Sequence, residues 1–279
     1  MNSVPDGSRE RQAEAPGNAG PGVWLLPAAL AALALGAAIV LRRSVRRRLQ
    51  PFAPIFIGES LEAPLTESPA TLGIAHNGGD TKEGMELVRA HNVDVVEIDV
   101  ALVGGRLDVV HTPPRIIPRL LHPLVYTSAT LDDAWRELPA GVDVYLDLKT
   151  RGRRTANEVV RVIEGNGERT IYAGSSDLPT LGFIRSLLPD AETVFYPRTR
   201  MGLARLLAMD PLPVRGISIP PDNLDAAVVR RAQGAGLFVW TGIVNDRRRV
   251  REVLDWQVDG LISDDLVVLA GLREGRVGA

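Results

Sequence analysis

The chain contains no cysteine among its 279 residues. Disulfides, thiolate metal sites and cysteine nucleophiles are therefore excluded, and this absence fits a reducing compartment. An excess of positive charge is also lacking, because the formal net charge is -2, so nucleic acid is not expected as a partner. The hydrophobic content of 45% and the charged content of 24% are ordinary for a protein with a globular core.

One long stretch, residues 23–41, contains no charged side chain. As a helix it would span roughly 28 Å, about the thickness of the hydrocarbon core of a bilayer. A cleaved signal peptide would carry its basic region before the apolar run, whereas here five arginines follow it, at positions 42, 43, 46, 47 and 48. We therefore predict a single transmembrane anchor, with the arginine flank and everything after it in the cytoplasm.

The composition of the rest of the N-terminal region predicts segments without a folded core. Residues 1–22 are polar and rich in proline and glycine, which predicts a disordered tail. Residues 42–70 combine the basic flank with a proline-rich linker. Within that linker, the apolar stretch PFAPIFIG (51–58) is expected either to lie on the membrane surface or to pack on the folded domain, which we place at residues 71–279.

Short apolar runs alternate with helix-like segments throughout that domain. The expected strands are 71–75, 93–100, 142–148, 170–173, 192–196, 216–219, 237–241 and 260–263. The expected helices are 82–91, 131–138, 155–164, 179–188, 198–209, 224–233, 247–256 and 266–272. Eight strand–helix units predict an α/β fold, a (β/α)8 TIM barrel, and no glycine-rich phosphate loop favours the rival, a doubly wound open sheet. In a TIM barrel, functional residues lie at the C-terminal ends of the strands.

The stretch VDVVEIDVALVGGRLDVVH (93–111) contains the main candidate residues of a functional site. Glu97 and Asp99 lie two residues apart on an expected buried strand, so both carboxylates point to the same side. The glycine pair 104–105 predicts a hairpin whose return arm brings His111 near Asp99. Buried carboxylates need a cation beside them, which is either a basic side chain or a metal ion.

Further reactive side chains follow other expected strands. His76 precedes a glycine pair at the end of the first strand, and Asp147 and Lys149 lie two apart at the end of the third. Glu97, Asp99 and Asp147 are hard oxygen donors of the kind that bind Mg²⁺ or Ca²⁺. Two imidazoles can act as general base and general acid, and a lysine adds a fixed charge for an anion. This set of residue types suits a phosphate diester.

The ordered motifs resemble those of the glycerophosphodiester phosphodiesterase family. They are His-x-Gly-Gly, Glu-x-Asp, a glycine hairpin returning to His, acid-x-Lys, and the segments FVWTGIVND (238–246) and VDGLISDD (258–265). The resemblance implies a barrel with His76 and His111 as acid and base. It implies Glu97, Asp99 and Asp147 as ligands of a divalent metal, Mg²⁺ or Ca²⁺. It also implies attack on phosphorus by a neighbouring hydroxyl of the substrate, which gives a cyclic intermediate.

The resemblance extends to the substrate pocket, with differences. Lys149 would hold a phosphate oxygen, and Trp240 would line the pocket for the alcohol group, unless it is a core tryptophan. Asn77 stands where the family has an arginine that clamps phosphate, so its contact with phosphate would be weaker. The Pro-Glu-Asn segment is missing, Thr112 replaces the aspartate after the second histidine, and an aspartate replaces glutamate as the third ligand.

These differences leave three functions open. The main expectation is a membrane-anchored, metal-dependent hydrolase of glycerophosphodiesters, acting by histidine acid–base catalysis. The segment DLKT (147–150) and the short connection after His111 are similar to the related sphingomyelinase D and lysophospholipase D barrels, which would make lipid headgroups the substrate. Loss of the arginine clamp instead suggests a barrel that binds phospholipid without turnover.

Overall fold

The computed structural model describes residues 55–59, 71–110, 129–166 and 169–277. Its strands are β1 (Leu72–Ala75), β2 (Val95–Val103), β3 (Arg106–Val109), β4 (Asp143–Leu148), β5 (Ile171–Ser175), β6 (Glu192–Phe195), β7 (Gly216–Ile219), β8 (Phe238–Ile243) and β9 (Gly260–Ser263). Its helices are α2 (Lys82–His91), α4 (Leu131–Glu137), α5 (Arg153–Glu164), α6 (Leu178–Leu187), α7 (Arg200–Leu207), α8 (Ala226–Gly234), α9 (Arg247–Asp255) and α10 (Leu266–Val277), with a 3-10 turn, η2 (Pro221–Asn223).

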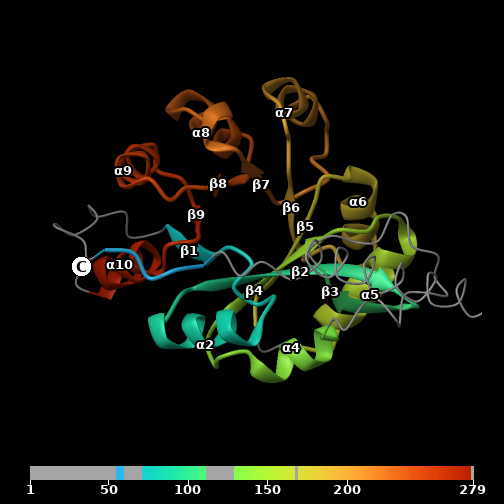
Figure 1. Cartoon of the computed structure of the whole chain (residues 1–279). Coiled ribbons are helices and arrows are strands. Elements are labelled where there is room, and N and C mark those ends of the chain that lie inside the picture. The colour runs from blue at the N-terminus through green and yellow to red at the C-terminus, as the bar shows by residue number, and fades with distance from the viewer. Residues whose placement is uncertain (1–54, 60–70, 111–128, 167–168, 278–279) are drawn as a thin grey trace, which may run out of the picture. The chain divides into compact units, whose positions relative to one another are not determined.

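The strands close into a barrel (Figure 1). They follow the order β1-β9-β8-β7-β6-β5-β4-β2-β3 in a 9-stranded sheet, and β1 also pairs with β2. The β3 strand is antiparallel to β2, so the other strands form a closed ring of parallel neighbours. A helix follows each strand of the ring, or its hairpin, in the chain. The predicted (β/α)8 TIM barrel is therefore confirmed.

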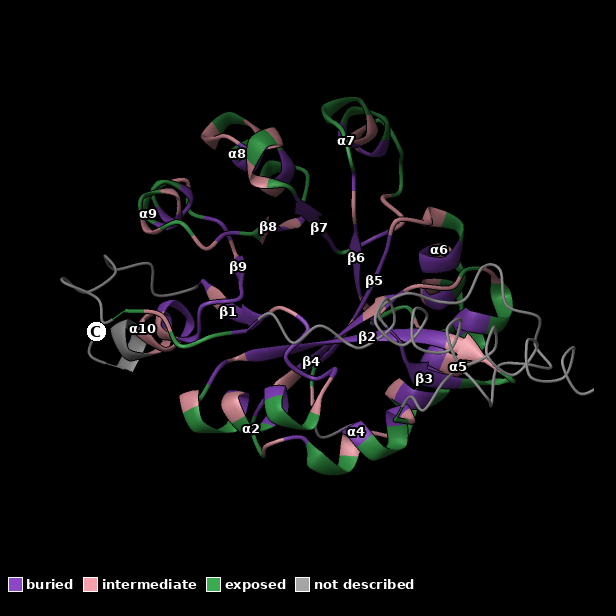
Figure 2. Cartoon of the chain, in the orientation of Figure 1, coloured by how far each residue is buried: buried purple, intermediate pink, exposed green. Residues whose placement is uncertain are grey.

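Alternation along each strand separates two apolar regions. Side chains at even positions of β2, such as Val96, Ile98 and Val100, pack in the large core between strands and helices. Val95 belongs instead to a smaller cluster inside the ring, with Ile74, Tyr145, Val194, Trp240 and Ile262. Because side chains alternate with a period of two, Glu97 and Asp99 share the inward side with Val95. Figure 2 shows the buried strands at the centre and the exposed outer faces of the helices.

Capping side chains mark where several helices begin. Thr81, Asp177, Thr199 and Asp246 each accept a hydrogen bond from a backbone N–H of the first turn that follows. Such caps satisfy donors that the helix itself leaves unpaired and are typically worth about 1 kcal/mol each. They lie in the loops after strands and so fix the geometry of the face on which the site forms.

The predicted hairpin is present. Gly104 and Gly105 both have positive φ values, 61° and 97°, in the turn between β2 and β3. The backbone N–H of Val110 donates to the carbonyl of Asp99 over 2.8 Å, so the return arm does pass Asp99. The next residue, His111, and Thr112 lie outside the described residues.

The N-terminal predictions fall largely outside the described part of the chain. The tail 1–22, the anchor 23–41 and all of the linker except residues 55–59 are not described. None of the helices in the described ranges combines the length and the apolar character needed to cross a bilayer. Residues 55–59 do pack on the domain, as one of the two expectations for the stretch 51–58 had it, because Phe56 forms a parallel bridge with Asp265.

Candidate active site

The ring order places the expected functional residues on neighbouring strands. The β1 strand lies between β9 and β2, and β2 lies between β1 and β4. His76 follows β1, Asp264 follows β9, and Asp99 is paired in register with Asp147 of β4. Because these strands are parallel, their C-terminal ends meet at one face of the barrel.

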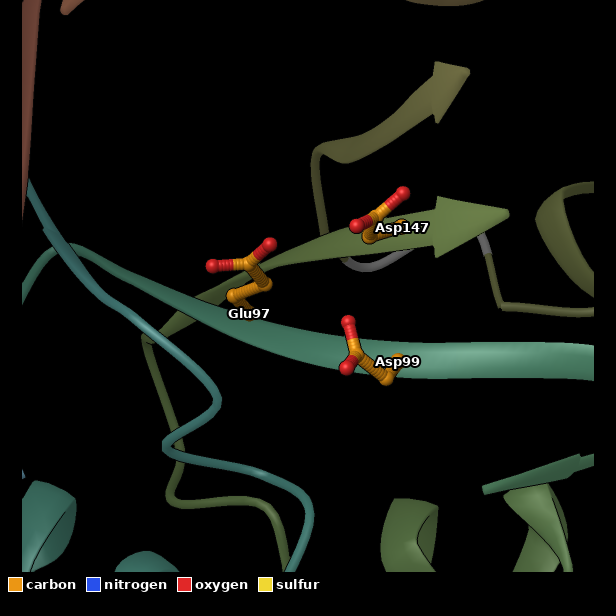
Figure 3. A group of neighbouring side chains, drawn as sticks. All are labelled: Glu97, Asp99 and Asp147. Carbon is orange, nitrogen blue, oxygen red and sulfur yellow. The ribbon is translucent and has the colours of Figure 1, made fainter. Parts of the chain in front are cut away.

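Three carboxylates converge at this face (Figure 3). Glu97, Asp99 and Asp147 each offer an oxygen, and these oxygens all lie within 4.8 Å of one another. The side chain of Asp99 is fully buried, and Glu97 is only 5% exposed. Three like charges this close in a buried setting repel strongly unless cations compensate them.

Lys149 supplies one of the compensating charges. Its Nζ lies 2.8 Å from Asp99 Oδ1 and also pairs with Asp147 Oδ2. Burial would lower the pKa of Lys149, but the carboxylates of Asp147 and Asp99 outweigh burial and raise it, so the lysine is a permanent cation. The hypothesis of a basic side chain beside the acids is thus correct for two of the three carboxylates.

Glu97 is the carboxylate with which Lys149 forms no ion pair in the described part of the chain. Its Oε2 is buried and has no hydrogen-bond partner within the described ranges. Burial, and then the charges of Asp147 and Asp99, raise the pKa of Glu97 well above its ordinary value. One ammonium group cannot neutralise three carboxylates, so a further cation fits this position. Three hard oxygen donors of this kind suit Mg²⁺ or Ca²⁺.

A fourth carboxylate, Asp80, was missed by the sequence reasoning. Its Oδ1 accepts a hydrogen bond of 2.8 Å from the backbone N–H of Asp99, and its Oδ2 is buried without a hydrogen-bond partner in the part of the chain that the structure describes. Burial and the nearby charge of Asp99 raise its pKa well above the ordinary value. Gly79 allows this approach, because a Cβ there would overlap Ile98. The segment GGD after His76 was the available signal.

His76 is oriented by a network from the last two strands of the ring. Its Nδ1 lies 2.7 Å from Asp264 Oδ1. Asn245 Nδ2 donates to Asp264 Oδ2 over 2.6 Å, while Asn245 Oδ1 accepts from the hydroxyl of Ser263 over 3.0 Å. Burial alone would raise the pKa of Asp264, but the hydrogen bonds to His76 and Asn245 lower it, so the aspartate is a carboxylate.

This arrangement directs the reactive nitrogen of the histidine. With Nδ1 bound to an ionised Asp264, the Nε2 of His76 is the atom available to exchange a proton. Burial raises the pKa of Asp147 above its ordinary value, and the charges of Lys149 and, to a smaller extent, His76 act against this rise. Asp264 and Asn245 were not among the predicted site residues, although both lie in the motif segments 258–265 and 238–246.

Two predicted pocket residues are buried. Asn77 is only 2% exposed and takes a left-handed backbone conformation, with φ of 51°. Trp240 is 1% exposed inside the ring, where its side chain packs against Tyr145, with ring centroids 5.0 Å apart, and against Tyr172, at 4.8 Å. Trp240 therefore fills the barrel, and its predicted contact with the alcohol group stays a prediction, as does the phosphate contact of Asn77.

Comparisons with known proteins place this geometry in context. No protein-family model matches the sequence, and none of the curated proteins matches it. Solved structures do match. A phosphodiesterase of Oleispira antarctica, in complex with the product sn-glycerol-3-phosphate, is 19% identical with a TM-score of 0.61, over 75% of this chain and 98% of its own.

Two further matches carry the name of one enzyme family. Glycerophosphodiester phosphodiesterases of Parabacteroides distasonis and Thermotoga maritima are each 17% identical, with TM-scores of 0.59 and 0.56. They cover 75% and 73% of this chain and 98% of their own lengths. The fold is that of the glycerophosphodiester phosphodiesterases. The resemblance noted from the motifs is thus confirmed for the architecture of the whole barrel.

Proposed function

We propose that the chain is a membrane-anchored, metal-dependent phosphodiesterase that hydrolyses glycerophosphodiesters. The observation that carries the proposal is the placement of His76, held by Asp264, at the end of β1, the strand that pairs with the one carrying Glu97 and Asp99 of the acid cluster. These residues lie at the C-terminal face of a barrel with the fold of glycerophosphodiester phosphodiesterases. The membrane part rests on the uncharged run 23–41 and the arginines after it.

Each side chain has a role in this chemistry. Glu97, Asp99 and Asp147 would hold a divalent cation, which when bound neutralises charge on the phosphate oxygens. The Nε2 of His76 takes or donates a proton, and Asp264 holds the ring in the tautomer that this requires. Lys149 lies against the same cluster and gives a fixed positive charge to a phosphate oxygen.

The reaction needs one proton acceptor and one proton donor. A hydroxyl oxygen, from water or from the alcohol next to the ester, forms a bond to phosphorus while the bond to the leaving alcohol breaks. One histidine takes the proton of the attacking hydroxyl, and the other protonates the departing oxygen. We assign these roles to His76 and His111. If the substrate's own hydroxyl attacks, water then opens the cyclic phosphate.

The direct test measures release of choline, ethanolamine or glycerol by the full-length chain. Glycerophosphodiesters and lysophospholipids are offered in turn, each with Mg²⁺ or Ca²⁺ and with a chelator. We expect turnover of glycerophosphodiesters that needs metal and is lost in His76→Ala. The matched control is His91→Ala, because His91 lies on α2 with its Nδ1 against the carbonyl of Leu87, and its loss should leave activity unchanged.

Two other outcomes would redirect the assignment. Turnover confined to lysolipids would favour an enzyme like the lysophospholipase D and sphingomyelinase D barrels, an alternative that the segment DLKT (147–150) and the short connection after His111 support. Metal binding without turnover of any diester would favour a barrel that binds lipid headgroups without catalysis. The proposed cytoplasmic location of the domain is tested separately, by protease access in right-side-out and inverted vesicles.

A further inference from the structure

A short segment outside the barrel is bound to the end of its last strand. We call residues 55–59 the strap. The backbone N–H of Phe56 donates to the carbonyl of Asp264 over 2.7 Å, and the N–H of Leu266 donates to the carbonyl of Phe56 over 2.9 Å. The strap thus extends the sheet beyond β9, at the residue whose side chain orients His76.

Side chains fix the strap further. Arg247, at the start of α9, donates to the carbonyl of Glu59 over 2.8 Å and pairs with Asp265 over 2.7 Å. The N–H of Gly58 donates to Asp265 Oδ1 over 3.2 Å. Ile55 is only 5% exposed and belongs to the main core. The strap is therefore an integral part of the folded domain, and one side of it faces solvent.

That outer side is apolar. Phe56 is 43% exposed and Ile57 is 60% exposed, next to one another in the chain. Placing large apolar side chains in water on a segment held by four hydrogen bonds is unfavourable unless something covers them. Single exposed apolar residues are common on protein surfaces. The significance of Phe56 and Ile57 therefore depends on where the other exposed apolar side chains lie.

The exposed apolar side chains are unevenly distributed over the barrel. In the described ranges the large ones are Phe56, Ile57, Phe183, Leu187, Met201, Met209 and Ile243. Ile243 ends β8, Met201 lies in the first turn of α7 after β6, and the strap lies beyond β9, so Phe56, Ile57, Met201 and Ile243 lie at the end of the barrel that carries the site, whereas Phe183 lies within α6. Leu187 and Met209 come at or after the ends of α6 and α7, which is the opposite end of the barrel.

The proposed anchor would connect the strap to a membrane surface. Residues 42–54 separate it from the predicted anchor 23–41, and a chain of that length reaches at most roughly 45 Å. The first part of this connection carries the five arginines. Arg248, exposed on α9 beside the residue that holds the strap, adds a cation at the same rim. Arginines next to apolar side chains suit the phosphate and acyl layers of a phospholipid surface.

We infer that the strap, with the apolar rim formed by Ile243 and Met201, docks on the phospholipid bilayer that carries the anchor, so that the site opens toward lipid headgroups. This inference rests on the proposed function and extends it, because it adds phosphodiesters presented at a membrane surface to the soluble glycerophosphodiesters as substrates. The strap carries no catalytic group. It places the face of His76 and Asp264 against the surface from which the substrate comes.

The absence of cysteine makes this testable by labelling at single positions. Full-length Ile57→Cys and Leu187→Cys are each labelled with an environment-sensitive fluorophore and reconstituted in vesicles of phosphatidylcholine and phosphatidylglycerol. Some of the lipids carry nitroxide groups on their acyl chains. We expect at least a threefold stronger quenching at position 57, which is 60% exposed, than at position 187, which is 44% exposed and lies at the other end of the barrel.

Equal quenching at both positions, or none at position 57, would overturn the inference. A change at position 57 that depends on protein concentration without vesicles would also overturn it, because a second copy would then cover the rim. The quenching result stands whether or not the protein turns over any diester.

A second experiment tests whether docking of the strap affects which substrates are turned over. Phe56→Ser with Ile57→Ser changes only side chains, so the backbone bonds of the strap are retained. We expect turnover of vesicle-embedded lysophospholipid to fall at least fivefold, with turnover of soluble glycerophosphodiesters unchanged. An equal loss on both kinds of substrate would refute the docking role, whereas inactivity of the unsubstituted protein on every diester would refute the proposed function alone.

Discussion

Replacing Glu97 by glutamine is expected to stabilise the metal-free protein and to abolish its stabilisation by metal. Two unit charges 4.8 Å apart repel by about 3.5 kcal/mol at an effective dielectric constant of about 20. An ionised Glu97 would face two such charges, on Asp99 and Asp147, and the attraction of Lys149 would offset only part of this repulsion, so the folded protein favours the protonated form. A glutamine is neutral at every pH and can donate hydrogen bonds to the remaining carboxylates.

The raised pKa of Glu97 determines how the effect of Glu97→Gln on stability depends on pH. The pKa of Glu97 is raised above its ordinary value of 4.5, by burial first and then by Asp147 and Asp99. Below pH 4.5 both the folded and the unfolded chain hold this proton, so the substitution changes little there. As the pH rises above 4.5, the unfolded chain releases the proton while the folded chain keeps it, so the wild type loses stability relative to Glu97→Gln. We expect a gain of about 1–3 kcal/mol at pH 8, the scale of one unsatisfied buried group.

The assay is urea unfolding at pH 4.5 and pH 8, with chelator and with Mg²⁺ or Ca²⁺. A metal at about 100 times its Kd stabilises the wild type by about 2.7 kcal/mol, and the variant, which lacks one ligand, should gain little at the same concentration. Glu86→Gln, an exposed acid on α2, is the control and should change neither value. The reasoning is refuted if Glu97→Gln is less stable than the wild type in chelator at pH 8.

Three further substitutions test the site and the barrel. Asn245→Ala should lower kcat about 10- to 100-fold with little change in KM, because it releases the aspartate that orients His76; some loss of stability should accompany this, because the Ser263 hydroxyl and the Asp264 backbone N–H also lose their acceptor, and an unchanged kcat would refute the positioning role. Gly79→Ala should destabilise by about 1–3 kcal/mol because its methyl group would overlap Ile98, whereas Gly182→Ala, with open space in α6, should be stabilising; equal effects would contradict the packing. Trp240→Ala should destabilise by about 3–5 kcal/mol, and a raised KM without loss of stability would instead place the indole in the pocket.

Local periodicity was enough to predict the framework of the barrel. The expected strands 216–219 and 260–263 and the expected helix 82–91 coincide with β7, β9 and α2. Other boundaries move by one to three residues, as in β2, which continues to Val103 because its hairpin arm pairs with it, except that α10 continues to Val277, five residues beyond the expected end at 272. The two-residue spacing of Glu97 and Asp99 predicted a shared direction, and the structure confirms it, because side-chain alternation is a property of the strand itself.

Relations between distant parts of the chain were decided only by closure of the barrel. Asp264 reaches His76 across 188 positions of sequence because β9, the last strand, pairs with β1, the first. The same closure brings the strap to β9 and so beside the site. Asp80 was hidden for a related reason, since only the turn after β1 carries its carboxylate to the backbone of Asp99.

The sequence by itself therefore determined which strands and helices form, which face of each strand is apolar, and which residue types are available for phosphodiester chemistry. The tertiary structure alone decided which of these residues meet. It paired Lys149 with two of the acids, left one oxygen of Glu97 buried without a hydrogen-bond partner in the described part of the chain, and joined the histidine to an aspartate near the other end of the chain. The physical reason is that alternation and capping act over a few residues, whereas partners across a ring of parallel strands are set by the order in which the strands close.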